Sequence, residues 1–154
     1  MSRGQVRLRQ AIAAPPDVVF AYLTNLARSP EWDPAVKQVT PMTRGPLRKG
    51  TVLRGTLDVA GETYHVDDEV TELDPPWRFA IRSVQGGADG IAYALSLDDE
   101  GRTALEATLS YDLPDPPPGA ARDSASLRQE LIDGLTGSLE ALKALIEREA
   151  APST

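Results

Sequence analysis

The sequence predicts an α+β fold in which a curved antiparallel sheet of six to seven strands wraps around one long C-terminal helix, with two short helices after the first strand. Two observations predict it. Apolar residues alternate with a period of two through residues 36–111, across short connections, and a long amphipathic pattern covers residues 122–149. A helix of that length must bury its apolar face, and the sheet is the partner large enough to cover it.

The first third of the chain alternates strand and helix signals. Residues 5–12 alternate as in a half-exposed strand. Pro15 and Pro16 then end the strand and begin a helix, because proline is tolerated in the first helical turn. The prolines within residues 29–34 predict a break and a second short helical turn. The apolar stripe of the first helix recurs at i, i+4 and i+7: Val19, Leu23 and Leu26.

The middle of the chain predicts an antiparallel meander. Its connections are short and rich in glycine, proline and acidic residues, as in the hairpin signal around Gly61. The glycine-rich connection 86–90 is the segment that we expect to admit a ligand. The predicted strands cover residues 36–41, 51–60, 62–73, 77–83, 91–98 and 102–111.

The predicted C-terminal helix has small residues at its centre. Gly134, Gly137 and Ser138 lie beside Leu135, and each glycine inside a helix costs about 1 kcal/mol relative to alanine. Two interpretations stay open: space for a ligand beside the helix, or close approach of a strand or of the first helix. Large side chains that could fill the space between helix and sheet are scarce, since aromatic residues make up 5% of the chain. A straight helix on a curled sheet therefore predicts an internal cavity.

Composition excludes several classes of function. The 154 residues suit one domain, 1–154, and the net charge of −7 disfavours nucleic-acid binding. The chain has no cysteine and a single histidine, His65, so we expect no metal and no cofactor. It has no apolar run long enough for stable membrane insertion and no signal segment, which favours a cytoplasmic protein, either a monomer or a homodimer.

Several short segments form an ordered pattern along the chain: residues 13–20 with Leu23, Pro30-Glu31-Trp32, Gly50, residues 70–76, Gly101-Arg102-Thr103 and residues 139–147. Together they resemble the START-like (SRPBCC) superfamily, and within it the branch named polyketide cyclase/dehydrase and lipid transport. The resemblance covers nearly the whole chain and implies a helix-grip domain. Members of this superfamily range from lipid carriers and hormone receptors to aromatase/cyclases of polyketide pathways.

Asp68 is the first candidate catalytic residue. Alternation places it on the inner face with Tyr64, Val66 and Val70. Desolvation of a carboxyl group in an apolar cavity raises its pKa and suits it to general acid or base chemistry. The alternatives are an ion pair with an inward arginine, or a bulge that turns Asp68 outward. Arg54 falls on the opposite face, where we expect it to be solvated.

Tyr93 is the second candidate catalytic residue. Tyr64, Tyr93 and Tyr111 fall on the predicted inner face, where a phenol can orient a ligand carbonyl. Plain core packing is the alternative for each. Trp32 is either a cavity wall or a clamp between the short helix and the sheet. His65, out of phase with the inner face, is expected to face solvent.

The sequence supports two main functions. The first is binding of a hydrophobic small molecule, lipid- or polyketide-like, between the sheet and the last helix. The second is a polyketide cyclase or dehydratase that uses Asp68 and Tyr93. A regulatory partner module is a third, which no residue favours. The expected ligand-binding residues are Trp32, Leu53, Leu57, Tyr64, Val66, Phe79, Ile81, Leu95, Leu109, Tyr111, Leu131, Gly134, Leu135 and Ser138.

Overall fold

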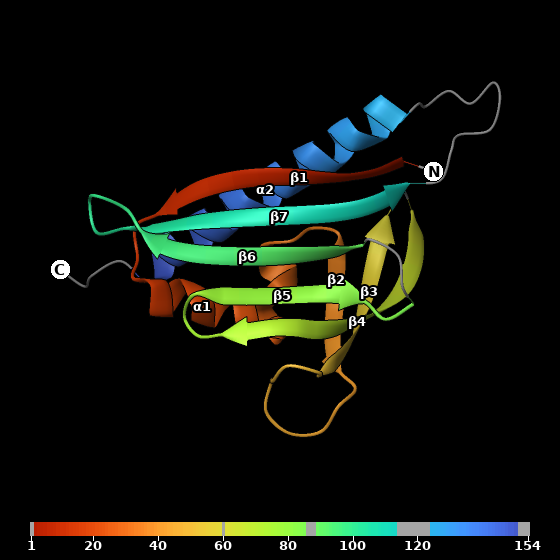
Figure 1. Cartoon of the computed structure of the whole chain (residues 1–154), viewed down its shortest axis with the longest axis horizontal. Coiled ribbons are helices and arrows are strands. Elements are labelled where there is room, and N and C mark those ends of the chain that lie inside the picture. Colours follow the sequence, from red (N-terminus) through yellow and green to blue (C-terminus); the bar gives the residue numbers. More distant parts are fainter. Residues whose placement is uncertain (1, 60, 86–88, 114–123, 151–154) are drawn as a thin grey trace.

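The computed structural model describes residues 2–59, 61–85, 89–113 and 124–150. Seven strands form one antiparallel sheet in the order β1-β7-β6-β5-β4-β3-β2. All three helical segments lie behind this sheet in Figure 1, so one face is covered and the other is exposed. The predicted fold class is confirmed. The strands are β1 (Ser2–Ile12), β2 (Val36–Pro41), β3 (Val52–Val59), β4 (Glu62–Asp74), β5 (Arg78–Ser83), β6 (Gly90–Leu97) and β7 (Thr103–Leu113).

The helical segments are α1 (Pro16–Thr24), the short 3-10 helix η1 (Leu26–Glu31) and α2 (Ser124–Glu149). Pro16 occupies the first turn of α1 as expected, and Pro30 lies inside η1. Strand β1 begins three residues earlier than the alternation predicts, because its pairing with β7 continues to Ser2 opposite Leu113. Predicted helix residues 122 and 123 lie outside the described residues.

The sheet curls strongly. Strands β2 and β3 run across the direction of β1 and β7 in Figure 1. The register shifts between Val36 and Gln38 in β2, and between Val70 and Glu72 in β4. Such bulges bend a strand and increase its twist. Gly61, with φ of 81°, occupies the β3–β4 hairpin in a conformation that other residues rarely adopt. The curl gives the covered face its concave shape.

The hydrophobic core lies between the second half of α2, α1 and the concave face of the sheet. Leu142 and Ile146 of α2 are fully buried there, as are Val19 of α1 and Leu105 of β7. The apolar stripe of α2 therefore faces the sheet along its C-terminal turns, as the sequence predicts.

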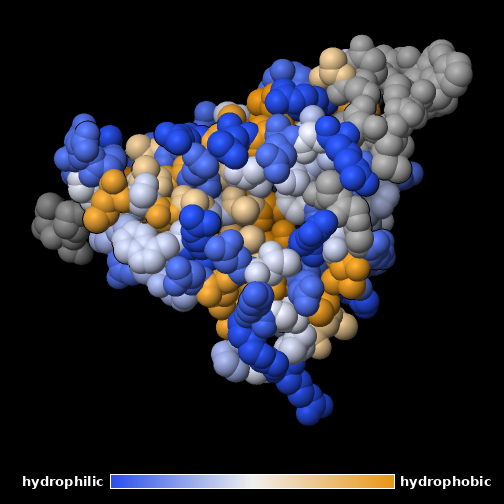
Figure 2. Space-filling model, in the orientation of Figure 1, coloured by the Kyte–Doolittle hydropathy of each residue, from blue (hydrophilic) through white to orange (hydrophobic). Residues whose placement is uncertain are grey.

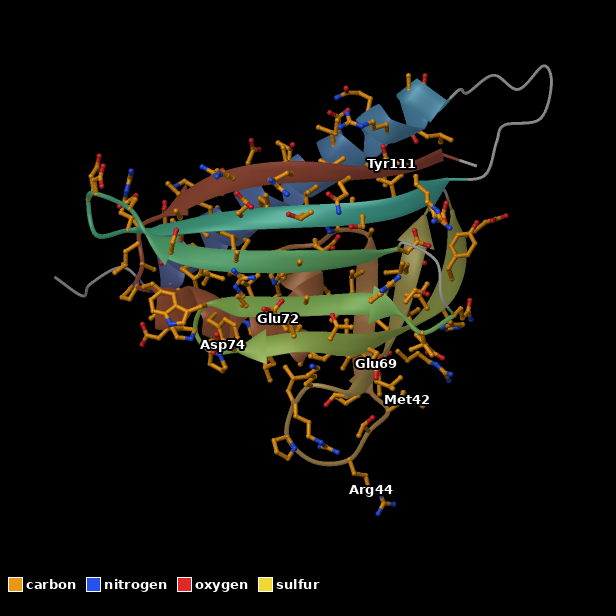
Figure 3. All side chains as sticks on the ribbon, viewed as in Figure 1. Met42, Arg44, Glu69, Glu72, Asp74 and Tyr111 are labelled. Atoms are coloured by element: carbon orange, nitrogen blue, oxygen red, sulfur yellow. The ribbon has the colours of Figure 1, made fainter. Side chains whose placement is uncertain are left out.

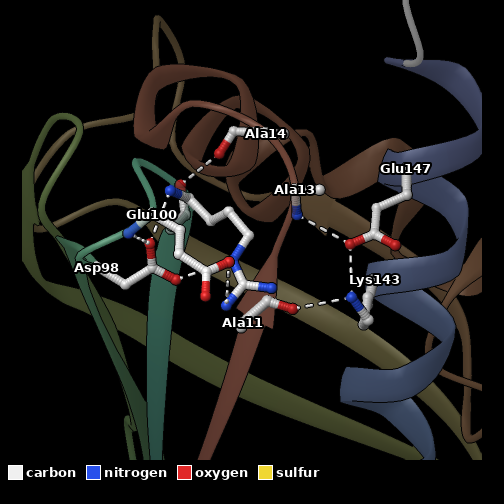
Figure 4. A network of polar contacts seen from close by, with 9 residues as sticks. Ala11, Ala13, Ala14, Asp98, Glu100, Lys143 and Glu147 are labelled. Carbon is white, nitrogen blue, oxygen red and sulfur yellow. Dashed lines mark hydrogen bonds and ion pairs between the residues drawn. The ribbon is translucent and has the colours of Figure 1, made fainter.

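Polar contacts attach the C-terminal half of α2 to the end of β1 (Figure 4). Lys143 Nζ donates to the carbonyl oxygen of Ala11 at 3.0 Å, and the backbone N–H of Ala13 donates to Glu147 Oε2 at 2.8 Å. Lys143 and Glu147 also pair with each other. These contacts pair backbone groups that the end of β1 leaves outside the sheet ladder.

A second attachment fixes η1 against the last turn of α2. The guanidinium of Arg28 contacts Glu149 at 2.7 Å and Glu31 at 2.6 Å. The hydroxyl of Tyr22 donates to Glu149 at 2.7 Å. Because η1 leads directly into Trp32, these contacts help to set where the indole lies.

The exposed face of the sheet is turned toward the viewer in Figure 2 and is largely hydrophilic, with scattered apolar side chains. Arg54 lies on this face, as expected, but it is not simply solvated: it forms two hydrogen bonds with Asp67, at 2.9 and 3.1 Å. His65 is exposed beside Thr56. Within the described residues, no helix is both long enough and apolar enough to cross a membrane.

Candidate functional site

A cavity of about 490 Å³ lies between the concave face of the sheet, η1 and α2. Strand residues from β2 to β7 supply most of its wall, and most of the lining side chains are apolar. The cavity brings together eleven of the residues that the sequence selects: Trp32, Leu53, Leu57, Val66, Asp68, Phe79, Ile81, Tyr93, Leu109, Tyr111 and Leu131.

Helix α2 contributes less to this wall than the sequence predicts. Leu131 is its one lining residue among those described. Leu135 and Ser138 are buried in the core without lining the cavity. Gly134 faces solvent, and an added Cβ there would meet nothing within 4 Å. The placement of Gly134 in the site is therefore wrong, because it lies about 100° around the helix from the inward Leu135.

Asp68 reaches the cavity from β4, as alternation predicts. Its side chain forms no hydrogen bond or ion pair within the described part of the chain, so neither alternative interpretation applies. Desolvation raises its pKa, and repulsion from Asp67 and Asp89 adds to the effect. Asp68 is thus a partly buried acid that faces an apolar space without a partner.

Asp33 is a second cavity acid, which the sequence analysis missed. It follows Trp32 directly after η1 and lines the cavity. Burial raises its pKa, while hydrogen bonds from the backbone of Ala35 and the hydroxyl of Ser138 oppose that shift. The available signal was an acidic residue beside Trp32 at a helix break, which has no periodicity to reveal its orientation.

Tyr93 lines the cavity from β6 and is 8% exposed. Its ring stacks on Phe79 of β5, with centroids 6.4 Å apart and planes 9° from parallel. Burial, and secondarily the negative charge of Asp33, raise the pKa of Tyr93 above its usual value. Its phenol therefore keeps its proton at neutral pH and is available as a hydrogen-bond donor.

The other two candidate tyrosines differ. Tyr111 is buried and closes the cavity wall near the end of β7, beside β1 (Figure 3). Tyr64 is 46% exposed, and its hydroxyl donates to Glu62 at 2.6 Å. The placement of Tyr64 in the site is wrong. It belongs to the inward set of β4 by alternation, but it lies near the start of the strand, where residues 62–65 are all exposed.

Two further predicted residues occupy the core side of the site. Leu95 is buried but does not line the cavity, because it lies toward the end of β6 that α1 covers. Trp32 is 6% exposed and forms part of the wall. Its indole N–H is buried and has no hydrogen-bond partner among the residues that the structure describes. Of the predicted opening at 86–90, residues 86–88 lie outside the described residues, and Asp89 and Gly90 line the cavity.

No group of three or more histidine or acidic side chains is arranged to hold a metal ion in the described parts of the chain. The acidic run of Asp67, Asp68 and Glu69 does not converge, since successive strand residues point to opposite faces. The site therefore offers carboxyl, phenol and serine hydroxyl groups on a mostly apolar wall.

The sequence profile of the family described as polyketide cyclase / dehydrase and lipid transport matches residues 3–147. This chain belongs to that family. The match covers most of the chain, including every strand and all the described cavity residues. No curated protein is similar enough in sequence to count as a match.

Several solved structures share this fold. The Zhui aromatase/cyclase from Streptomyces sp. R1128 superposes with a TM-score of 0.78 at 21% identity, covering 97% of this family member and 96% of that chain. A START superfamily protein from Mycobacterium smegmatis gives a TM-score of 0.72 at 18% identity, and the match covers 94% of this family member and 97% of that chain. The di-domain ARO/CYC StfQ of the steffimycin biosynthetic pathway gives a TM-score of 0.76 at 18% identity. This match covers 97% of this family member and 53% of that chain.

Proposed function

We propose that this family member binds an apolar small molecule in the cavity between the sheet and α2. The observation that carries the proposal is the cavity of about 490 Å³, whose wall is mostly apolar and lies against the buried core. A concave, mostly apolar space of this size, with a few polar groups on its wall, is typical of a small-molecule binding site.

The energetics of such binding are favourable without any catalytic group. Burial of about 300–400 Å² of apolar ligand surface yields roughly 8–10 kcal/mol before association costs. Loss of translational and rotational freedom removes a large part of this. Micromolar affinity is the expected result, which suits a protein that carries or senses a ligand.

Titration with the uncharged fluorescent dye N-phenyl-1-naphthylamine tests the proposal, because the emission of this dye rises in apolar surroundings. Val66→Trp places a large side chain inside the cavity and should weaken dye binding. His65→Trp adds a similar bulk one residue away, on the exposed face, and should leave binding unchanged. Absence of dye binding to the native protein, or equal loss in both variants, would contradict the proposal.

A second candidate function is a cyclase or dehydratase acting on a substrate with several carbonyl groups. It is favoured by two cavity acids with raised pKa values, Asp33 and Asp68, near the phenol of Tyr93. A carboxylate of raised pKa can remove a proton from carbon between two carbonyls, and a phenol can stabilise the enolate that forms. For such an enzyme, Asp68→Asn and Tyr93→Phe would reduce turnover by orders of magnitude while the substrate still binds.

A further inference from the structure

The charged groups of the cavity all have one sign. Asp33, Asp68 and Asp89 line it, and no lysine, arginine or histidine is found among the lining residues that the structure describes. Basic residues on the same strands point away: Arg54 of β3 lies on the exposed face and pairs with Asp67. The net charge of −7 adds to the negative potential.

The three acidic side chains differ in the hydrogen bonds that they accept. Asp33 accepts hydrogen bonds from the backbone of Ala35 and from Ser138. The exposed Asp89 accepts one from the backbone N–H of Asp112 at 3.0 Å. Asp68 has no such partner within the described chain, although it is partly buried and faces the apolar space. A partly buried carboxyl group loses part of its hydration, and a ligand group that donates a hydrogen bond to it offsets that loss.

We propose, building on the binding function above, that the cavity selects apolar molecules whose polar end donates a hydrogen bond or carries a positive charge, with a protonated amine as the strongest case, and that it rejects carboxylates. An amine beside Asp68 would pair with it and would relieve its repulsion from Asp67 and Asp89. A carboxylate in the same place would add a fourth negative charge and would meet no cation among the described lining residues. Simple fatty acids are therefore poor ligands for this cavity.

Three probes with the same alkyl chain test this selection at pH 7: decylamine, decanol and decanoate, each below its micelle concentration. The affinity of each probe is measured by its displacement of N-phenyl-1-naphthylamine from the native protein. We expect decylamine to bind about tenfold more tightly than decanol, and decanoate about tenfold more weakly, since a single nearby charge changes affinity by that order.

Asp68→Asn has a matched control in Asp67→Asn, which removes the same charge from the neighbouring residue on the exposed face. Asp68→Asn should reduce the amine-to-carboxylate ratio by about tenfold, and Asp67→Asn should change it little. If Asp68→Asn does not fold, the order of the three probes on the native protein decides the matter, and Asp89→Asn serves as the second variant.

The outcomes separate this inference from the function on which it rests. Decanoate binding at least as tightly as decylamine would overturn the selection while leaving the cavity as a binding site. An unchanged ratio in Asp68→Asn would also overturn it, because the discrimination would then come from elsewhere. Failure of the native protein to bind the dye would overturn the binding function itself, and the selection with it.

Discussion

The Oη atom of Tyr111 lies 2.3 Å from the point that a Cβ atom on Gly4 would occupy, and Cζ of the same ring lies 2.6 Å from it. The two residues face each other across the β1–β7 pair. The tyrosine ring covers the bare backbone of β1, an arrangement known to stabilise glycine in strands. Gly4 therefore allows Tyr111 to close the cavity wall.

Gly4→Ala should destabilise the protein by about 1–3 kcal/mol, the usual cost of overpacking a buried contact. The methyl group would displace the Tyr111 ring, so dye binding in the cavity should change as well. Urea denaturation gives the free energy of unfolding. In a Tyr111→Ala background the same Gly4→Ala change should lose its penalty, and an equal penalty in both backgrounds would show that the ring is not the cause.

Gly134→Ala and Gly137→Ala should have the opposite effect. Both glycines lie on the exposed side of α2, and an added Cβ at either would meet nothing within 4 Å. Each substitution should stabilise the protein by about 0.5–1 kcal/mol, because alanine restricts the unfolded chain and favours the helix. Thermal denaturation measures the gain. Dye binding should be unaffected, and a loss of binding in Gly134→Ala would restore this residue to the site.

Asp68→Asn should stabilise the protein at neutral pH. The pKa of Asp68 in the folded protein is raised above its ordinary value of 3.8 by desolvation, so the folded state holds the proton more tightly than the unfolded state does. Stability is lost as the pH rises from about 3.8 through the folded pKa, and the penalty persists above it. The advantage of Asp68→Asn should therefore disappear in acid, as unfolding free energies measured from pH 3 to 7 would show. An advantage that does not vary with pH would exclude titration of this carboxyl group as its source.

Glu149→Gln should show the reverse pH dependence. Hydrogen bonds from Arg28 first, and then from Tyr22, lower the pKa of Glu149 from 4.5 to about 2. Its contribution to stability is thus present above pH 4.5 and is lost as the pH falls toward 2. The variant should be less stable than the native protein at pH 7, and the two should converge in acid. Glu140→Gln, an exposed change on the same helix, is the control and should have little effect at any pH.

The sequence predicts most of the sheet because a period of two needs only local information. It places Val66 and Asp68 in the cavity correctly and keeps His65 outside. It fails at Tyr64, since alternation identifies the face of a strand but does not show where the helical cover of that face ends. The position of that edge depends on how far α2 and η1 extend over the sheet, which is a tertiary property.

The sequence-based prediction also differs from the structure at Asp33 and Gly134, and there too the cause is a tertiary property. Asp33 lies in a turn without periodicity, and it is brought to the cavity by the fold of η1 against the sheet. Gly134 fits neither of its two interpretations, since it faces solvent and an added Cβ would meet nothing within 4 Å. The second case required the orientation of α2 about its axis, which the sequence constrains only through the wider apolar stripe.

The two halves of α2 are held very differently. Its last turns are fixed to β1 through Lys143 and Glu147 and to η1 through Glu149. Its first half projects past the edge of β1 in Figure 1, lines the cavity with Leu131 and makes a long hydrogen bond to β1, from Arg128 to the carbonyl oxygen of Gln5 at 3.4 Å. If the cavity binds a ligand as proposed, outward movement of these early turns would enlarge it while the packed end stays in place, which would accommodate ligands of different length.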